Sequence, residues 1–390
     1  MRARFASMSV AVLALTACGG GGDSVSPGTQ PVTIATPIST GSADPVAVAP
    51  VAVPVIEAPA PMVAFGYTLA PAARPTANNP IPVGKCINMG GMLERDKEAD
   101  FTGRKIKDSD FATIRAAGFD TVRLPVNFAA HADAAAPYAI DPVFMARVRH
   151  VVDTGKAAGL NIIIDQHSYD QLQKDPFAHR DRFVAIWRQV AEAYRNDGSN
   201  VWFELHNEPL WELYKKVNVW EIFTPAIAEI RKTNPTRPII VAGNGGSGPE
   251  SLALLDIPAN DRNIIPTFHF YDPREFTEQG AAWTTIRYPL GRALAENDRQ
   301  SIDKAIAMVS AYIKRTGRVP FLGEYGTRYI PEITAQDRGK YMGWVSAGFA
   351  SVGVQSCAWS YINGFQLYSD TQGWLPGMDT IQTTTTLLPS

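Results

Sequence analysis

The stretch Val201-Trp-Phe-Glu-Leu-His-Asn-Glu-Pro209 joins an apolar run to a polar end. The run predicts a buried β-strand over 201–206, and Glu208 follows it directly. A second stretch, Val319-Pro-Phe-Leu-Gly-Glu-Tyr-Gly326, has the same layout and ends in Glu324. The chain therefore places one carboxylate near the carboxyl end of each of two predicted strands.

Apolar runs of this kind recur from about residue 82 onward and alternate with longer amphipathic segments. The predicted strands are 84–89, 119–124, 161–165, 201–206, 238–242, 264–269, 319–323 and 353–359. Helical patterns between them include Phe144 to Ala158, Arg182 to Arg195 and Ile302 to Arg315. Near-continuously apolar strands separated by helices predict parallel β-α units. Eight such units over roughly 310 residues favour an α/β fold of the closed (β/α)₈ TIM-barrel type.

A doubly wound open sheet is the competing topology. It has less support, because no Gly-x-Gly-x-x-Gly turn follows the first predicted strand and nucleotide binding is not indicated. After Trp359 the chain is rich in glycine, threonine and aromatic residues, and Met378 to Leu388 is the one segment there that suggests a closing helix.

The first 80 residues differ in composition from the rest. Residues 1–17 have a short basic start and an apolar stretch too short to span a bilayer, as in a secretory signal. Leu15-Thr-Ala-Cys18 resembles a bacterial lipoprotein box, which implies lipidation of Cys18; an ordinary signal peptide with an incidental cysteine is the alternative. Residues 18–80 are rich in proline, alanine, valine and glycine, which predicts a disordered tether before a single domain at 81–390.

The tether would hold the domain at a membrane surface through lipid alone. Gly19 follows the cysteine where an inner-membrane retention signal usually has aspartate, so we expect export and anchoring in the outer membrane or at the cell surface. The formal net charge of −2 gives no reason to expect nucleic-acid binding. We expect a monomer.

Two cysteines, Cys86 and Cys357, lie on the first and eighth predicted strands. These strands are neighbours in a closed barrel, and each cysteine shares parity with an inward position, Asn88 or Trp359. Both thiols should therefore face inward near one another. Export permits a disulfide, but we expect a reduced pair, because barrel strands already hold their neighbours in place.

Polar residues cluster at the carboxyl ends of the predicted strands, where barrels place their chemistry. Three of the six histidines lie there. The strand-end residues are Arg123, Asp165, His167, His206, Asn207, Glu208, His269, Tyr271, Glu324 and Trp359. Two carboxyl groups at such a face suit glycosidic bond cleavage, which needs one acid to protonate the leaving oxygen and a second carboxylate to attack or to activate water.

Eight of these residues resemble, in order and strand by strand, the site of glycoside hydrolase family 5. The sharpest segments are Phe119-Asp-Thr-Val-Arg-Leu-Pro125, Phe203-Glu-Leu-His-Asn-Glu-Pro209, Leu322-Gly-Glu-Tyr-Gly326 and His269 to Trp283, which is similar to bacterial cellulases of the family. The resemblance spans about residues 82–375 and implies a retaining hydrolase. It implies Glu208 as general acid and base, and Glu324 as nucleophile.

The resemblance also assigns substrate contacts. It implies that Asn207 bonds the sugar 2-hydroxyl, that Trp359 forms the floor, and that His167 and His269 bind hydroxyls or orient the carboxylates. Arg123 and Tyr271 would keep Glu324 ionised. The acid Glu208 should have a pKa raised by burial and a nearby carboxylate.

Simpler alternatives remain for several of these residues. Arg123 could instead be a buried partner of Glu204, His206 a packing residue, and Trp359 part of the core. Trp202 and Trp220 are assigned to the core or the surface, whereas Trp211 and Trp374 stay open as sugar-subsite residues.

Two other function classes compete with a glycosidase. A metal-dependent barrel hydrolase would want a His-x-His motif on the first strand, and Lys85-Cys-Ile-Asn-Met-Gly90 has no histidine, so we expect neither metal nor cofactor. An inactive surface glycan-binding lipoprotein would not need both glutamates. Within the family, we expect an endoglucanase acting on β-1,4-glucan, with β-1,4-mannanase or xyloglucanase as alternatives.

Overall fold

The computed structural model describes residues 62–70, 81, 84–215, 219–255 and 257–378. The predicted signal peptide 1–17, Cys18 and most of the predicted tether lie outside the described residues. The predicted closing helix does too, apart from Met378.

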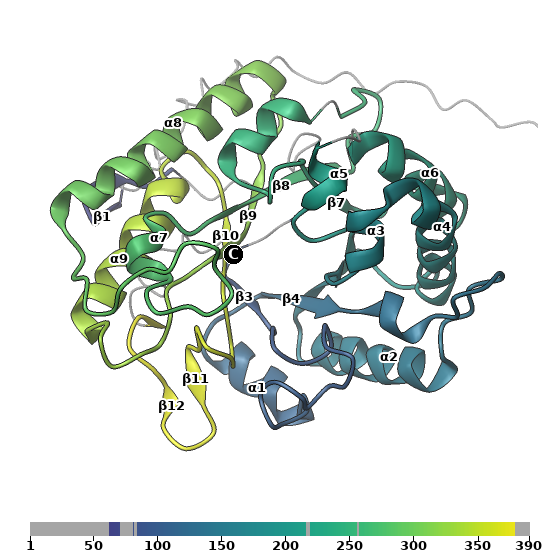
Figure 1. The fold of residues 1–390 in the computed structure, drawn as a ribbon, viewed down its shortest axis with the longest axis horizontal. Coiled ribbons are helices and arrows are strands. Elements are labelled where there is room, and N and C mark those ends of the chain that lie inside the picture. The colour runs from purple at the N-terminus through teal and green to yellow at the C-terminus, as the bar shows by residue number, and fades with distance from the viewer. Residues whose placement is uncertain (1–61, 71–80, 82–83, 216–218, 256, 379–390) are drawn as a thin grey trace, which may run out of the picture. The chain divides into compact units, whose positions relative to one another are not determined.

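Eight parallel strands form a closed barrel, as predicted (Figure 1). In the order of their pairing they are β10 (Ser356–Ala358), β3 (Cys86–Asn88), β4 (Thr121–Val126), β5 (Asn161–Gln166), β6 (Val201–Glu204), β7 (Ile239–Ala242), β8 (Ile264–Phe270) and β9 (Phe321–Tyr325). Each corresponds to one predicted strand, with ends that differ by up to three residues. The competing open sheet is excluded, because the first strand β3 pairs with the last strand β10.

Helices follow the strands, and the longer of them cover the outside of the barrel (Figure 1). They are α1 (Asp108–Ala116), α2 (Pro142–Ala157), α3 (Asp170–Lys174), α4 (Pro176–Ala193), α5 (Trp211–Lys215), α6 (Val219–Thr233), α7 (Arg274–Thr277), α8 (Arg299–Thr316) and α9 (Ala335–Ala350). The predicted helical patterns correspond to α2, α4 and α8. Helices α2 and α4 begin at a proline after a capping aspartate, Asp141 and Asp175, which accepts a backbone N–H of the first turn. Between β7 and β8 the described chain has only the 3₁₀ turn η2 (Pro249–Leu254).

Side chains that alternate along the strands fill the barrel interior in layers. The layer nearer the amino ends of the strands, here called the lower layer, is apolar. It consists of Ile81, Cys86, Ile163, Trp202, Ile240, Ile265, Phe321 and Cys357, each no more than 4% exposed. Further along lie buried polar side chains, here called the upper layer. Asn88, Asp165 and Glu204 are two residues beyond Cys86, Ile163 and Trp202 on β3, β5 and β6, Glu324 is three residues beyond Phe321 on β9, and Arg123 joins them from β4.

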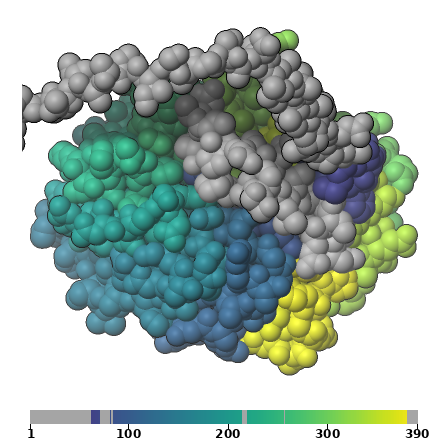
Figure 2. All heavy atoms as spheres, turned by 180° about the vertical axis from the view of Figure 1, so that it is seen from behind, coloured from purple at the N-terminus to yellow at the C-terminus, as the bar shows by residue number. Residues whose placement is uncertain are grey.

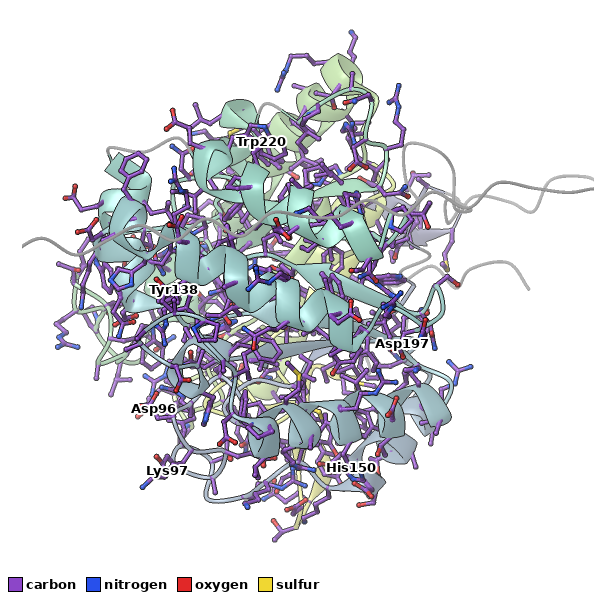
Figure 3. The ribbon with its side chains drawn as sticks, turned by 90° about the vertical axis from the view of Figure 1, so that its right-hand side faces the viewer. Asp96, Lys97, Tyr138, His150, Asp197 and Trp220 are labelled. Carbon is purple, nitrogen blue, oxygen red and sulfur yellow. A yellow bond between two sulfur atoms is a disulfide. The ribbon has the colours of Figure 1, made fainter. Side chains whose placement is uncertain are left out.

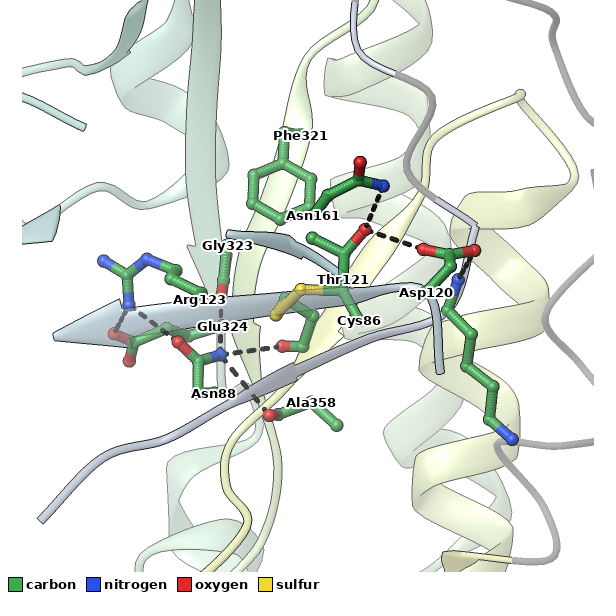
Figure 4. Close-up of a disulfide and its surroundings, with 12 residues drawn as sticks. Cys86, Asn88, Asp120, Thr121, Arg123, Asn161, Phe321, Gly323, Glu324 and Ala358 are labelled. Carbon is green, nitrogen blue, oxygen red and sulfur yellow. Dashed lines mark hydrogen bonds and ion pairs between the residues drawn. A yellow bond between two sulfur atoms is a disulfide. The ribbon is translucent and has the colours of Figure 1, made fainter. Parts of the chain in front are cut away.

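Cys86 and Cys357 form a disulfide bond in the lower layer (Figure 4). The two residues are register partners on β3 and β10, and their Cα atoms are 4.3 Å apart. The expected proximity and inward direction of the two side chains are thus confirmed. The expectation of a reduced pair was wrong, because register pairing places the two inward-facing cysteines close enough for their sulfurs to bond.

Residues 62–70 fold against the barrel helices, although the sequence assigned them to the tether. They form a hairpin of β1 (Val63–Ala64) and β2 (Tyr67–Thr68), and Figure 2 shows this purple segment beside the green and yellow-green atoms of the C-terminal half. The Tyr67 hydroxyl donates to Asp303 on α8 at 2.6 Å. The Phe65 ring occupies the space above Gly343 of α9, where a Cβ would lie 2.5 Å from it. The packed domain therefore includes residues before 81.

No helix within the described ranges has the length and apolar character needed to cross a membrane.

Candidate active site

All eight predicted site residues come together at the carboxyl end of the barrel. Arg123 lies within β4, His269 within β8 and Glu324 within β9, and the others follow the last residue of β5, β6, β8 or β10 by one to four positions. Above them is a cleft of about 780 Å³. Six of the eight line it: His167, Asn207, Glu208, Tyr271, Glu324 and Trp359. Arg123 is fully buried and His269 is 4% exposed.

Glu208 and Glu324 face one another across His269. The His269 Nδ1 atom is 2.8 Å from Glu208 Oε1 and 3.6 Å from Glu324 Oε2. One oxygen of each carboxylate and one ring nitrogen of His269 all lie within 4.8 Å of one another. The Glu208 side chain is 31% exposed and that of Glu324 only 6%, so Glu208 is the more accessible of the two from the cleft.

The Glu208–His269 hydrogen bond determines which of these two side chains carries the proton they share. Burial would raise the pKa of Glu208, but the hydrogen bond and charge of His269 outweigh it, and the pKa lies below its ordinary value. For His269, burial lowers the pKa, but Glu324 and Glu208 together raise it above the ordinary value. The expected raised pKa of Glu208 is therefore wrong, because that expectation counted burial and a nearby carboxylate but not the hydrogen bond and charge of His269.

Glu324 accepts hydrogen bonds from two sides. Arg123 Nη1 donates to Glu324 Oε1 at 2.7 Å, and the Tyr271 hydroxyl donates to Oε2 at 2.8 Å. Burial, followed by the charge of Glu324, raises the pKa of Tyr271 well above its ordinary value, so the phenol keeps its proton and stays a donor. The two donors hold the Glu324 carboxylate in one orientation, with one bond to each of its oxygens.

Arg123 is both a site residue and the structural partner of Glu204, the two roles that the sequence left open. Its Nε and Nη2 atoms donate to the two oxygens of Glu204 at 2.7 and 2.8 Å. Nη2 also donates to Asn207 Oδ1 at 2.9 Å, which leaves the amide NH₂ of Asn207 as its free donor group at the cleft.

Trp359 and His167 lie side by side at the bottom of the cleft. Their rings are stacked, with centroids 5.6 Å apart and an interplanar angle of 9°. His167 Nδ1 is 2.6 Å from Asp165 Oδ2, and the charge of Asp165 raises the pKa of His167 despite the opposing effect of burial. Gly90 leaves room for the indole, because a Cβ there would lie 2.5 Å from Trp359. Trp359 is half-buried and lines the cleft, so it is not a plain core residue.

His206 is not among the residues that line the cleft. It is fully buried, and neither ring nitrogen has a hydrogen-bond partner among the described side chains. Burial lowers its pKa to about 4, so the ring is neutral near neutral pH. The packing role considered from the sequence therefore fits His206.

The tryptophans left open by the sequence do not line this cleft. Trp374 lies on the short strand β12 (Gly373–Trp374) and packs against Phe119 and Tyr368. Trp211 is 45% exposed on α5 with the Lys174 ammonium 5.0 Å from its ring centroid. Trp202 is core, and Trp220 lies on the outer helices beside a separate groove between α4 and α6 (Figure 3).

Several cleft residues were missed from the sequence. Trp283, 61% exposed, and Tyr288 lie on the loop after α7, and Arg274 and Glu278 lie on or beside α7 itself. The signal for Trp283 was its place in the segment His269 to Trp283. A second cavity of about 540 Å³ adjoins the first, since both are lined by Glu94, Arg95 and Phe101. The cleft thus continues past the two glutamates toward the loops after β3 and β5.

Glu208, His269 and Glu324 also have the geometry of a possible metal-ligand cluster. A three-residue cluster of this kind matches the ligand number of catalytic zinc sites. His269 Nδ1 and Glu208 Oε1 lie at hydrogen-bond distance, 2.8 Å, and the pKa values of the two groups shift in the directions expected for a shared proton. The histidine is better described as a proton partner of the carboxylate.

Comparison with known proteins gives a consistent result. The family model for cellulase (glycosyl hydrolase family 5) matches residues 84–364. Endoglucanase H of Acetivibrio thermocellus is 30% identical over 293 residues, which cover 74% of this chain and 31% of that protein. Cellodextrinase A of Ruminococcus flavefaciens is 29% identical over 287 residues, 69% of this chain and 83% of that protein. The chain therefore spans about a third of the length of endoglucanase H.

Solved structures extend the similarity to the fold. A hyperthermophilic endo-β-1,4-glucanase in complex with substrate superposes with a TM-score of 0.73 and 33% identity, over 77% of this chain and 96% of that one. Cel5A of Thermotoga maritima in complex with mannotriose gives 0.72 and 30%, over 77% and 97%.

Proposed function

This chain belongs to glycosyl hydrolase family 5 and is a glycoside hydrolase, and on that premise we propose that it cleaves β-1,4-glucan internally with retention of anomeric configuration. The observation that supports retention is the distance of at most 4.8 Å between oxygens of Glu208 and Glu324. Retaining glycosidases have carboxyl groups roughly 5–5.5 Å apart, whereas inverting ones leave roughly 6.5–9.5 Å for a water molecule.

Glu324 is the proposed nucleophile. Two donors, Arg123 and Tyr271, stabilise its ionised form, and it is the less exposed carboxylate. Attack on the anomeric carbon would form a glycosyl ester with Glu324 as the glycosidic bond breaks. The Asn207 amide would bond the sugar 2-hydroxyl, and Trp359 with the stacked His167 would support the ring.

Glu208 is the proposed acid and base. With its low pKa it shares one proton with His269 across the 2.8 Å hydrogen bond, and transfer of that proton to Glu208 would present the acid to the leaving oxygen. After the leaving sugar departs, ionised Glu208 would take a proton from the attacking water, which releases the product from Glu324.

The substrate proposal rests on the relatives and on the cleft. The two curated relatives and one superposed structure carry endoglucanase, cellodextrinase or endo-β-1,4-glucanase in their names. The adjoining cavities of about 780 and 540 Å³ give room for several sugars on both sides of the cleavage point, which favours internal cleavage. β-1,4-Mannan is the second candidate, because the Cel5A structure at 30% identity holds mannotriose.

Product analysis on soluble β-glucans, β-mannans and xyloglucan, with and without a chelator, tests this proposal. We expect early release of mixed oligosaccharides from β-1,4-glucan, an initial β-anomer by NMR, and no effect of chelator. Release of monosaccharide or disaccharide alone would contradict internal cleavage, and an α-anomer would contradict retention. Loss of activity with chelator would support the metal-dependent class, and binding without turnover would support the glycan-binding alternative.

A 2-deoxy-2-fluoro glycoside tests the nucleophile directly. The fluorine slows breakdown of the glycosyl-enzyme, so the label should accumulate on Glu324 and be found there by peptide mapping. A label on any other residue would remove the proposed assignment.

The anchor is a separate proposal, since Cys18 and the signal peptide lie outside the described residues. We propose lipidation of Cys18 and attachment to the outer membrane or cell surface. Cys18→Ser should move the protein from the membrane fraction to the soluble fraction with unchanged activity per molecule. A wild-type protein found only in the soluble fraction would contradict it.

A further inference from the structure

The guanidinium of Arg123 has no unused donor. Its five N–H groups donate to five acceptors at 2.7–2.9 Å: both oxygens of Glu204, and one oxygen each of Asn88, Asn207 and Glu324. Arg123 also lies 2.9 Å from Asp165 Oδ2. Because every N–H is used, the planar group cannot rotate without losing bonds. Its orientation therefore fixes the donor that reaches Glu324, shown in Figure 4 with the bond to Asn88, and the donor that reaches Asn207.

Glu204 is the residue that determines this orientation. It supplies two of the five acceptors, and its parallel pair of bonds to Nε and Nη2 is the bidentate geometry that fixes a guanidinium in both direction and plane. Each of the other three acceptors supplies a single bond. Glu204 is fully buried beneath the cleft and is not among the residues that line it, so it does not touch substrate.

Charge balance alone does not explain Glu204. Asp165 and Glu324 already place two carboxylates within 2.9 Å of Arg123. Glu204 adds a third, in register with Asp165 on the neighbouring strand. Burial raises the pKa of Glu204, and Asp165 raises it further against the effect of Arg123, so its ionised form is disfavoured there. A third buried carboxylate that costs free energy needs another reason for its presence.

We propose that Glu204 is a positioning residue for the hydrolase: it aligns Arg123, and through Arg123 it aligns both Glu324 and the Asn207 amide. This proposal rests on the proposed roles of Glu324 and Asn207. It predicts that Glu204 affects the chemical steps and not the shape of the cleft. Because positioning tolerates little displacement, loss of the bidentate pair should reduce catalysis by about 10²-fold.

The test compares Glu204→Gln and Glu204→Asp with Thr267→Val as a matched control. Thr267 is also fully buried inside the barrel, and its hydroxyl donates to the Phe321 carbonyl instead of the Arg123 group. Active sites are counted with the 2-deoxy-2-fluoro glycoside, so that unfolded protein does not enter kcat. Both Glu204 variants should lose about 10²-fold in kcat per titrated site with little change in KM, and Thr267→Val should lose almost nothing.

Two outcomes would overturn the proposal. If kcat per titrated site is unchanged in the Glu204 variants, Glu204 has only a structural role. Full activity in Glu204→Asp, which keeps the charge but shortens the side chain, would show that charge and not alignment matters. If Glu204→Gln does not fold, Glu204→Asp gives the same two answers.

A double-mutant cycle with Arg123→Lys supplies an independent measurement. If Glu204 acts through Arg123, Glu204→Asp should have almost no further effect on kcat in the Arg123→Lys background. Additive losses would contradict the proposal. The wild type must be labelled and must turn over an aryl β-glycoside in the same assay. Failure of the wild type would count against the proposed function, whereas a normal wild type with active Glu204 variants counts only against the positioning role.

Discussion

The lower and upper layers of the barrel interior share the strands β3, β5, β6 and β9 and differ in almost every property. The lower layer holds Trp202, Phe321, three isoleucines of the strands and the Cys86–Cys357 disulfide. Two or three residues further along the shared strands lie the three carboxylates of the upper layer, around the buried Arg123 of β4. Two residues of strand, about 7 Å, thus separate the apolar side chains from the charged ones. The lower layer should therefore determine stability, and the upper layer activity.

Glu324→Gln should give the largest effect and should leave stability intact. Loss of the nucleophile should lower kcat on the order of 10⁶-fold. The midpoint of thermal unfolding should stay the same or rise, because one of three carboxylates around Arg123 loses its charge. Steady-state kinetics measures the loss of kcat, and calorimetry on the same sample measures the midpoint of thermal unfolding. A marked loss of stability would contradict the separation of the two layers.

Glu208→Gln should depend on the leaving group. Hydrolysis of natural polysaccharide should fall about 10²- to 10⁴-fold, since protonation of a poor leaving group is lost. Aryl glycosides with good leaving groups should lose less in their first step. Added azide should partly restore turnover and give a β-glycosyl azide, detected by mass spectrometry and NMR. Equal losses on both substrates without an azide product would exclude Glu208 as the acid.

Trp202→Ala should show the opposite behaviour to the two glutamate variants. It removes a large, 1% exposed side chain from the lower layer, so the free energy of unfolding should fall by about 3–5 kcal/mol. The KM of the folded fraction should remain unchanged. Urea unfolding followed by tryptophan fluorescence and kinetics below the transition provide the measurement. A changed KM with normal stability would show that the layers are coupled.

Replacement of both cysteines by alanine should have a smaller effect of the same kind. The disulfide spans 271 residues of sequence, and its loss should cost about 2–4 kcal/mol with activity preserved. Wild-type protein treated with a reductant is the control and should unfold at a similar urea concentration. Thiol titration of the untreated, denatured wild type should find both cysteines blocked. Detection of two free thiols would contradict the disulfide and support the reduced pair expected from the sequence.

The smallest expected effect is a pH shift. In the wild type the proton shared by Glu208 and His269 should leave at the raised pKa of His269. In His269→Gln the only remaining acid of the pair is a carboxyl group, whose ordinary pKa lies below that of histidine. The alkaline limb of kcat/KM should therefore move to lower pH, as a pH-rate profile would show. A limb that stays in place would show that His269 does not share the proton.

The residues predicted from sequence are those whose position follows from strand periodicity. A polar residue at or near the end of a predicted buried strand should lie near the barrel's carboxyl end, which is why Arg123, His167, Glu208 and Glu324 were found. The predicted direction of the pKa shift of Glu208 was wrong, because the shift depends on His269, 61 residues away, and on how closely the two side chains approach. Strand parity likewise predicted that two cysteines meet, but parity carries no information on whether they are oxidised.

The hairpin was missed for a different reason. Its two strands have two residues each and lie next to a stretch rich in proline and alanine, so neither periodicity nor composition marks them. The loop after α7 was missed in part because it has no regular structure beyond the helix itself.

The hairpin also sets a limit on how the barrel can be recombined with other modules. Gly343 and Gly348 of α9 have no side chains of their own; the Phe65 ring occupies the space above Gly343, and Tyr67 shares the space above Gly348 with Ile306 of α8. A gene fusion joined at residue 81 would transfer every strand of the barrel and still leave this helix face bare. Such a chimera should be catalytically complete but prone to self-association, and a junction placed before residue 62 should avoid the defect.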